Sequence, residues 1–300
     1  MKSLGMVKMF KGAITAIVTP FLENENIDEE SLKNLIEFQI KNNIDGIVPC
    51  GTTGESPTLS HEEHNKVVKL AINAANGKVP VIAGTGSNST REAISMTKHA
   101  LDYGADASLQ VCPYYNKPTQ EGLFRHFSAI ASAVDIPLII YNIQGRTGIN
   151  METATLARLA KEHSNIIGVK EASGNMAQMI EVINALPKNF TVLSGDDNLT
   201  LPLMYLGGKG VISVASNIIP RQMHELTEFA LSGDFENAAK LHYELLPLFK
   251  GIFIETNPIP IKAALAMKGL IKEVYRLPLC EMKTENREKL KAVLNGLKLI

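Results

Sequence analysis

The sequence IIGVKEAS (residues 166–173) contains the pattern that decides the fold of this chain. Its first four residues form a short apolar run, which is typical of a buried strand. Lys170 ends the run, so its amine is expected in partly desolvated surroundings, where the ammonium form is disfavoured and lysine can become a nucleophile. At its ordinary pKa only about one lysine in 2,500 is neutral at pH 7. The alternative is an ordinary solvated lysine at a strand end.

Seven further apolar runs repeat this pattern, and segments with helical spacing separate them. Strands that alternate with helices predict a parallel sheet, and eight such units predict a closed (β/α)8 TIM barrel over residues 9–233. An open doubly wound sheet is the alternative. The predicted strands are residues 13–19, 46–50, 79–83, 107–112, 137–142, 166–170, 191–194 and 210–214. The predicted helices are one beginning near Asp28 and residues 61–76, 90–103, 120–134, 151–163, 176–186, 199–206 and 219–231.

Polar motifs follow the predicted strands rather than precede them. The carboxyl ends of barrel strands meet at one rim, where barrel enzymes place their chemistry. Motifs far apart in the sequence are therefore expected to converge at one mouth. They are residues 51–56, 114–116, 141–148, 195–197 and 215–217, together with Lys170.

The two ends of the chain lie outside the predicted barrel. Helical patterns at residues 235–253, 258–268 and 286–299 predict a C-terminal helical subdomain over residues 234–300. Residues 1–8 contain lysines but no signal-peptide core, and we expect them to form a flexible extension.

Composition excludes several classes of protein. A net charge of −1 without long charge blocks argues against nucleic acid or an anionic membrane as a partner. No apolar stretch is long enough to span a bilayer. The three cysteines, Cys50, Cys112 and Cys280, form no CxxC motif, which fits a reducing cytoplasm and argues against a thiolate zinc site.

Several residues of the predicted rim are candidates for chemistry. Tyr141 ends the strand before that of Lys170, and its phenol could exchange a proton with a carbinolamine; an aromatic plug is the alternative. Thr52 and Thr53 lie in a small-residue turn that could bind a carboxylate, or that could be an ordinary capped turn. Arg146 suits bidentate carboxylate recognition, unless it is simply solvated.

Other polar patterns carry little weight. Residues 207–210 resemble a phosphate loop but precede a strand, and residues 84–86 lack the third glycine of a dinucleotide fingerprint. His61 and His64 are not part of a strong metal-binding motif. The adjacent carboxylates at 196–197 are weak evidence for a divalent ion. We therefore expect no metal.

Five motifs together resemble the dihydrodipicolinate synthase/N-acetylneuraminate lyase family of class I lyases, from residue 9 to the C-terminus. The motifs are GTTGES (51–56), YNIQGRTG (141–148), VKEASG (169–174), SGDD (194–197) and NPIPIK (257–262).

The resemblance implies a role for each matching position. Lys170 would form a Schiff base with pyruvate, and Tyr141 would act as acid and base at the same carbon. Thr52 and Tyr115 would complete a proton relay, with Tyr115 reaching in from a neighbouring subunit of a homotetramer. Thr53 would hold the pyruvate carboxylate.

Two further positions would line the lysine, Gly195 and Ile212. Since the lysine supplies the covalent activation, no cofactor is expected.

The second substrate depends on Arg146. Family members that act on L-aspartate 4-semialdehyde use an arginine here, whereas sugar-acid lyases typically lack it. The expected reaction is therefore condensation of pyruvate with L-aspartate 4-semialdehyde, in the diaminopimelate route to lysine. Gln144 departs from the usual proline and could loosen the loop. The alternatives are a pyruvate-dependent sugar-acid aldolase and a non-catalytic keto-acid sensor.

The resemblance also implies an effector site for L-lysine. Glu92 would bind an ammonium, while hydroxyl, imidazole and amide groups would complete a polar pocket. Pro57 could alter this pocket, and the alternative is that these side chains only mark helix starts. The implied effector residues are Ser56, His61, His64, Asn88, Glu92 and Tyr114.

Overall fold

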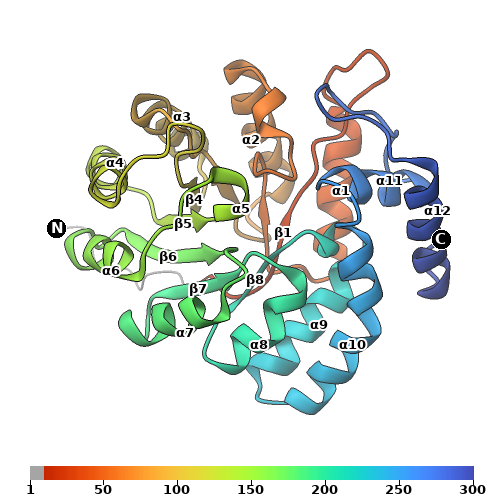
Figure 1. Ribbon diagram of the computed structural model, residues 1–300. Coiled ribbons are helices and arrows are strands. Elements are labelled where there is room, and N and C mark those ends of the chain that lie inside the picture. Colours follow the sequence, from red (N-terminus) through yellow and green to blue (C-terminus); the bar gives the residue numbers. More distant parts are fainter. Residues whose placement is uncertain (1–9) are drawn as a thin grey trace.

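The protein is described by a computed structural model that covers residues 10–300; the extension predicted at residues 1–8 lies outside the described residues. Its parallel strands form one eight-stranded sheet in the order β2-β1-β8-β7-β6-β5-β4-β3. Figure 1 shows these strands surrounded by helices. The strands are β1 (Gly12–Ala16), β2 (Gly46–Val48), β3 (Ile82–Gly84), β4 (Ala107–Val111), β5 (Leu138–Asn142), β6 (Ile166–Glu171), β7 (Thr191–Ser194) and β8 (Gly210–Ser213).

The sheet closes on itself. Strand β1 pairs with β2 on one side and with β8 on the other, where Ile14 lies opposite Ile212. A parallel bridge between Ile47 and Val81 joins β2 to the segment that enters β3. An open doubly wound sheet would leave two edges unpaired, so this alternative is wrong and the (β/α)8 barrel is confirmed.

Local capping explains where many helices begin and end. The Asp28 side chain accepts a hydrogen bond from the Ser31 amide at the start of α1, and Ser60 forms a capping box with Glu63 at the start of α2. Gly104, with a φ of 94°, ends α3. The helices around the barrel are α1 (Glu29–Lys41), α2 (His61–Ala75), α3 (Thr90–Tyr103), α4 (Gln120–Ala133), α5 (Gln144–Thr147), α6 (Thr153–Glu162), α7 (Met176–Ala185), α8 (Thr200–Tyr205) and α9 (Pro220–Leu231).

The third strand begins later than its apolar pattern predicts. The prediction starts at residue 79, whereas β3 starts at Ile82. Pro80 has no amide hydrogen for a strand ladder. The Val81 amide donates to the Asp106 carboxylate, 2.9 Å away, instead of to a neighbouring strand.

The core has two apolar layers. Side chains such as Ile14, Leu109 and Leu193 fill the barrel interior. A larger layer lies between the strands and the helices that surround them. This arrangement is the packed core of a closed barrel, so ligands have access only at its ends.

Three helices follow the barrel: α10 (Phe235–Gly251), α11 (Ile259–Met267) and α12 (Thr284–Gly296). Helix α10 packs against α9, and α12 packs against α10 and α11. Figure 1 shows this C-terminal helical region on one side of the barrel. Division into domains at residue 234 remains a prediction. Within residues 10–300, no helix has both the length and the apolar character needed to cross a membrane.

Candidate active site

Lys170 and Tyr141 lie at the same height on neighbouring strands. Tyr141 of β5 pairs with Lys170 of β6, and the lysine Nζ lies 4.2 Å from the centre of the tyrosine ring. Both side chains are buried, with exposed fractions of 6% for Lys170 and 5% for Tyr141. The predicted proximity of these two residues is confirmed.

An irregularity in the pairing of β5 with β6 produces this alignment. Leu138 lies opposite Ile166, but the next residue, Ile139, lies opposite Gly168. With regular pairing, Tyr141 would lie opposite Val169. Because side chains alternate between the two faces of a strand, Lys170 would then be out of step with the phenol.

The predicted lining residues lie close to this pair. A side chain at Gly195 would place its Cβ 3.0 Å from Lys170 Cε and 2.4 Å from Ala172 Cβ, so only glycine fits beside the extended lysine. Ile212 is fully buried and belongs to the same interior cluster as Tyr141.

A buried polar network supports the next pair of residues on these strands. Asn142 lies opposite Glu171, and its Nδ2 donates to the Glu171 carboxylate at 3.1 Å. The Ser173 amide donates to the same carboxylate at 2.8 Å, and Gln178 Nε2 donates to it at 3.3 Å. Sequence reasoning did not single out this network, which fixes the ends of both strands.

The turn at residues 51–56 is bound to the C-terminal helical region. Thr53 Oγ1 accepts a hydrogen bond of 3.0 Å from Asn257 Nδ2. Glu55 has a φ of 52° and forms an ion pair with Lys262, and both of these side chains are fully buried. The partners are about 200 residues apart in sequence, since the Thr53–Asn257 separation is 204. The NPIPIK motif marked residues 257–262 as functionally relevant, but nothing in the sequence indicated that Thr53 and Glu55 would be their partners.

Arg146 lies on α5, a short helix that was not predicted. Its Nη2 donates to the backbone carbonyl of Asn257 at 3.0 Å, while the side chain stays exposed. Gln144 begins this helix, and its carbonyl accepts from the Gly148 amide at 2.9 Å. Proline is favoured at the same helical position because its missing amide is not needed there. Glutamine therefore retains the helical turn here rather than opening it.

A cleft of about 380 Å³ lies over the C-terminal ends of the strands. Thr52, Tyr141 and Arg146 line it. Five of the six residues of the predicted effector site line the same cleft: Ser56, His61, His64, Glu92 and Tyr114. The sixth, Asn88, is not among the lining residues, but its Nδ2 donates to the Tyr114 carbonyl at 3.2 Å.

His64 and Glu92 have defined environments in this cleft. His64 is buried and its Nε2 lies 2.7 Å from the carbonyl oxygen of Gly84, which can only accept, so Nε2 carries the proton. Burial lowers the pKa of His64, and its Nδ1 has no hydrogen-bond partner among the described residues. The Glu92 carboxylate accepts from Ser87 Oγ at 2.9 Å. His64 is thus not an exposed helix-start residue, unlike His61.

Tyr115 is not brought into this cleft. It is 91% exposed and adopts a φ of 72°, a conformation that is uncommon outside glycine. Tyr115 is not among the residues that line the cleft.

The acidic pair at residues 196–197 has a structural setting. Asp197 is buried and accepts hydrogen bonds from Ser213 Oγ at 2.5 Å and from the Val214 and Ala215 amides at 3.1 and 3.0 Å. Burial raises the pKa of Asp197 to about 6. These contacts hold the end of β8, which weakens the interpretation of the pair as a divalent-ion site.

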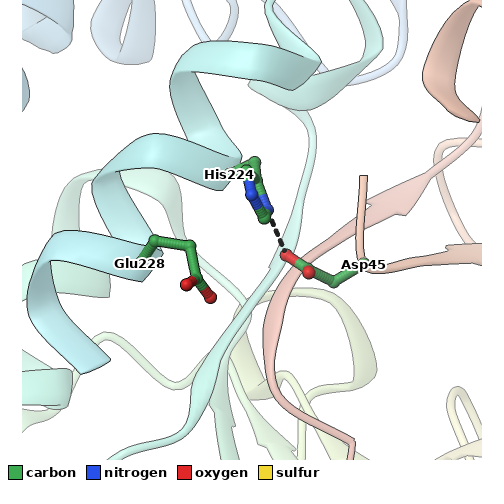
Figure 2. A group of neighbouring side chains, drawn as sticks. All are labelled: Asp45, His224 and Glu228. Atoms are coloured by element: carbon green, nitrogen blue, oxygen red, sulfur yellow. Dashed lines mark hydrogen bonds and ion pairs between the residues drawn. The ribbon is translucent and has the colours of Figure 1, made fainter. Parts of the chain in front are cut away.

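A second group of ionisable side chains lies at the opposite end of the barrel. Figure 2 shows Asp45, His224 and Glu228, whose donor atoms all lie within 4.8 Å of one another. His224 Nδ1 is 3.0 Å from Asp45 Oδ2, and this oxygen also accepts from the Ala13 amide at 2.8 Å. The Asp45 carboxylate therefore joins β1 and α9, far from Lys170.

Comparisons with known proteins place the chain among relatives of a single kind. A model of the dihydrodipicolinate synthetase family matches residues 9–297. A protein of Hydrogenobaculum sp. (strain Y04AAS1) named 4-hydroxy-tetrahydrodipicolinate synthase is 56% identical over 292 residues, which cover 97% of this chain and 100% of the relative.

Solved structures give the same result. The crystal structure of dihydrodipicolinate synthase from Aquifex aeolicus matches with a TM-score of 0.95 and 53% identity, over 97% of this chain and 99% of that chain. The structure of the enzyme from Cyanidioschyzon merolae with lysine bound matches with a TM-score of 0.94 and 43% identity, over 97% of this chain and 99% of that chain.

Proposed function

Because this chain belongs to the dihydrodipicolinate synthetase family, we propose that it catalyses the 4-hydroxy-tetrahydrodipicolinate synthase reaction through a Schiff base on Lys170. The substrates are pyruvate and L-aspartate 4-semialdehyde. The observation that carries the proposal is the buried amine of Lys170 held against Tyr141, beside a cleft with Arg146 in its wall.

The first steps form an enamine. The neutral Lys170 amine attacks the ketone carbon of pyruvate, and loss of water from the carbinolamine gives an iminium ion. Tyr141 lies beside the amine and exchanges the protons of these steps, with Thr52 and Tyr115 as its relay. The iminium accepts the electron pair released when the pyruvate methyl group loses a proton.

The remaining steps join the two substrates. The enamine carbon attacks the aldehyde, and the aldehyde oxygen takes up a proton. The amine of the semialdehyde then attacks the iminium carbon, which closes the ring and releases Lys170. The lysine supplies the covalent activation throughout, so the mechanism uses no organic cofactor or metal.

One hydroxyl group and one guanidinium group orient the substrates. Thr53 binds the carboxylate of pyruvate, and Gly195 and Ile212 shape the space beside the lysine. Arg146 binds the carboxylate of the semialdehyde at the edge of the cleft. A guanidinium group has several donors in a fixed plane, so Arg146 can contact Asn257 and still present donors to a ligand.

A coupled assay tests this function. Pyruvate and L-aspartate 4-semialdehyde should turn over, whereas sugar-acid substrates of related lyases should not. Turnover of a sugar acid in place of the semialdehyde would favour the aldolase alternative. Pyruvate binding without any turnover would favour the keto-acid sensor.

We further propose that the enzyme acts as a homotetramer in the cytoplasm. Tyr115 needs a neighbouring subunit to reach a catalytic lysine, since it is exposed on its own chain. The three cysteines are unpaired, which fits a reducing compartment.

The polar end of the cleft supports L-lysine as an effector. Glu92 offers a carboxylate to an ammonium group, and Tyr114 directly precedes Tyr115 in the chain. A ligand there would act on the proton relay without occupying the pyruvate site. The lysine-bound structure of the Cyanidioschyzon merolae relative gives a precedent for lysine binding in this family.

A further inference from the structure

Asn257 connects two residues that belong to different substrate sites. It lies just before α11 in the C-terminal helical region and is only 4% exposed. Its side-chain Nδ2 donates to Thr53 Oγ1, and its backbone carbonyl accepts from Arg146 Nη2; both distances are 3.0 Å. One buried residue thus touches the proposed pyruvate-carboxylate group and the proposed semialdehyde-carboxylate group.

The direction of the Thr53 contact matters for binding. An amide Nδ2 can only donate, so the Thr53 oxygen acts as the acceptor and its own proton remains available. Within residues 10–300, the Thr53 hydroxyl has no other hydrogen-bond partner. A hydroxyl that donates its proton is what a carboxylate requires. Asn257 therefore sets the polarity of Thr53 as well as its position.

A second contact holds the same two segments together. Glu55, two residues after Thr53, forms its ion pair with Lys262, five residues after Asn257. The Lys262 amine also lies 4.4 Å from the centre of the Phe21 ring. A buried ion pair that loses one partner leaves an uncompensated charge, so this contact resists separation of α11 from the turn.

We propose that Asn257 is a positioning residue for both carboxylate-binding groups, and that the C-terminal helical region thereby completes the active site. Its side chain orients Thr53 toward pyruvate, and its backbone carbonyl restrains Arg146. The inference rests on the proposed function, because Thr53 and Arg146 have their roles from it.

Two substitutions separate this role from a purely structural one. Asn257→Ala removes the donor to Thr53 and leaves the carbonyl that Arg146 contacts. The KM for pyruvate should rise roughly tenfold, while the KM for the semialdehyde changes much less. Asn257→Asp replaces the donor by an acceptor that captures the Thr53 proton, so the KM for pyruvate should rise further.

A matched control is Asn165→Ala. Asn165 is a partly buried asparagine whose Nδ2 likewise donates a hydrogen bond, at 2.9 Å to the Ala131 carbonyl, but it precedes β6 at the opposite end of the barrel. This control should lower the thermal unfolding temperature without changing either KM. The circular dichroism spectrum and unfolding temperature of each variant identify those that remain folded.

A double-mutant cycle measures the coupling between Asn257 and Thr53 even where a variant is destabilised. If Asn257 acts through Thr53, Asn257→Ala should change the KM for pyruvate little in a Thr53→Ala background. Wild-type KM for pyruvate in folded Asn257→Ala, or full additivity in the cycle, would overturn the positioning role. Failure of the wild type to condense the two substrates would instead overturn the proposed function, so the two failures are distinguishable.

Discussion

The Nζ of Lys170 lies 4.2 Å from the centre of the Tyr141 ring because β6 takes up one extra residue between its pairs with Leu138 and Ile139. A shift of one residue in a strand moves every side chain to the other face. The irregular pairing therefore decides whether a phenol and an amine can act on one carbon atom. It lies at the start of both strands, where Leu138 and Ile166 are buried.

Arg146 is expected to control the affinity for the second substrate. Arg146→Ala should raise the KM for L-aspartate 4-semialdehyde by roughly ten- to a hundredfold, because a hydrogen bond to a charged group contributes about 1.5–3 kcal/mol. The KM for pyruvate should change little. Arg146→Lys keeps the charge but loses the planar donors, so it should restore activity only in part. Unaltered semialdehyde kinetics in Arg146→Ala would support the sugar-acid alternative.

Tyr115 is expected to act on the site of a neighbouring subunit. Mixed assemblies of Tyr115→Phe and Lys170→Ala subunits should be more active than either variant alone, because one site then contains both intact residues. The control is a mixture of Lys170→Ala subunits with subunits that carry both Tyr115→Phe and Lys170→Ala. No site in this mixture contains Lys170. Mixed assemblies without any gain would mean that Tyr115 serves its own chain.

L-lysine is expected to inhibit through Glu92. At saturating pyruvate, the rate of the wild type should fall as L-lysine reaches millimolar concentrations. Glu92→Gln removes the charge but retains the size of the side chain, so inhibition should weaken. Glu62→Gln, an exposed charge on α2, should leave it unchanged. Full activity of the wild type at millimolar L-lysine would remove the effector site.

Acid should destabilise the fold partly through His126. This side chain is 6% exposed, and burial lowers its pKa from 6.5 to about 4. The unfolded chain then binds more protons between these values, so the stabilising contribution is present above pH 6.5 and is lost as the pH falls toward 4. From pH 7 to pH 5 it should fall by about 2 kcal/mol, at about 1.4 kcal/mol per pKa unit.

Urea unfolding at several pH values measures this effect. His126→Gln should reduce the difference in the free energy of unfolding between pH 7 and pH 5. His99→Gln, at an exposed position on α3, should retain the difference seen in the wild type. The same pH dependence in His126→Gln and in the wild type would contradict the role of His126.

Much of the fold was accessible from the sequence because strands buried in a barrel have continuous apolar runs. The predicted bounds of α3 and β7 agree with the structure, since capping residues and apolar periodicity both mark α3 and a short apolar run marks β7. Three of the motifs after the strands, residues 51–56, 114–116 and 141–148, contribute lining residues to one cleft, because parallel strands bring their carboxyl ends together. Lys170 and the motifs at 195–197 and 215–217 are not among the lining residues.

Contacts between residues far apart in the chain could not be predicted from the sequence in this way. Asn257 contacts Thr53 across 204 residues, and no local pattern predicts that pairing. The irregular register of β5 and β6 likewise has no signal in the apolar runs of the two strands. The burial of His64 could not be predicted, because His64 lies only one turn after the exposed start of α2.

Borohydride trapping with pyruvate tests the central claim most directly. Reduction of the iminium by hydride gives a stable secondary amine, so peptide mass mapping should find one reduced pyruvyl group on Lys170. The label should be absent from Lys262, the other buried lysine within residues 10–300, whose amine is paired with Glu55. Lys170→Ala should not be labelled. Labelling of Lys170→Ala with the efficiency of the wild type, or labelling of the wild type at a different lysine, would contradict the account.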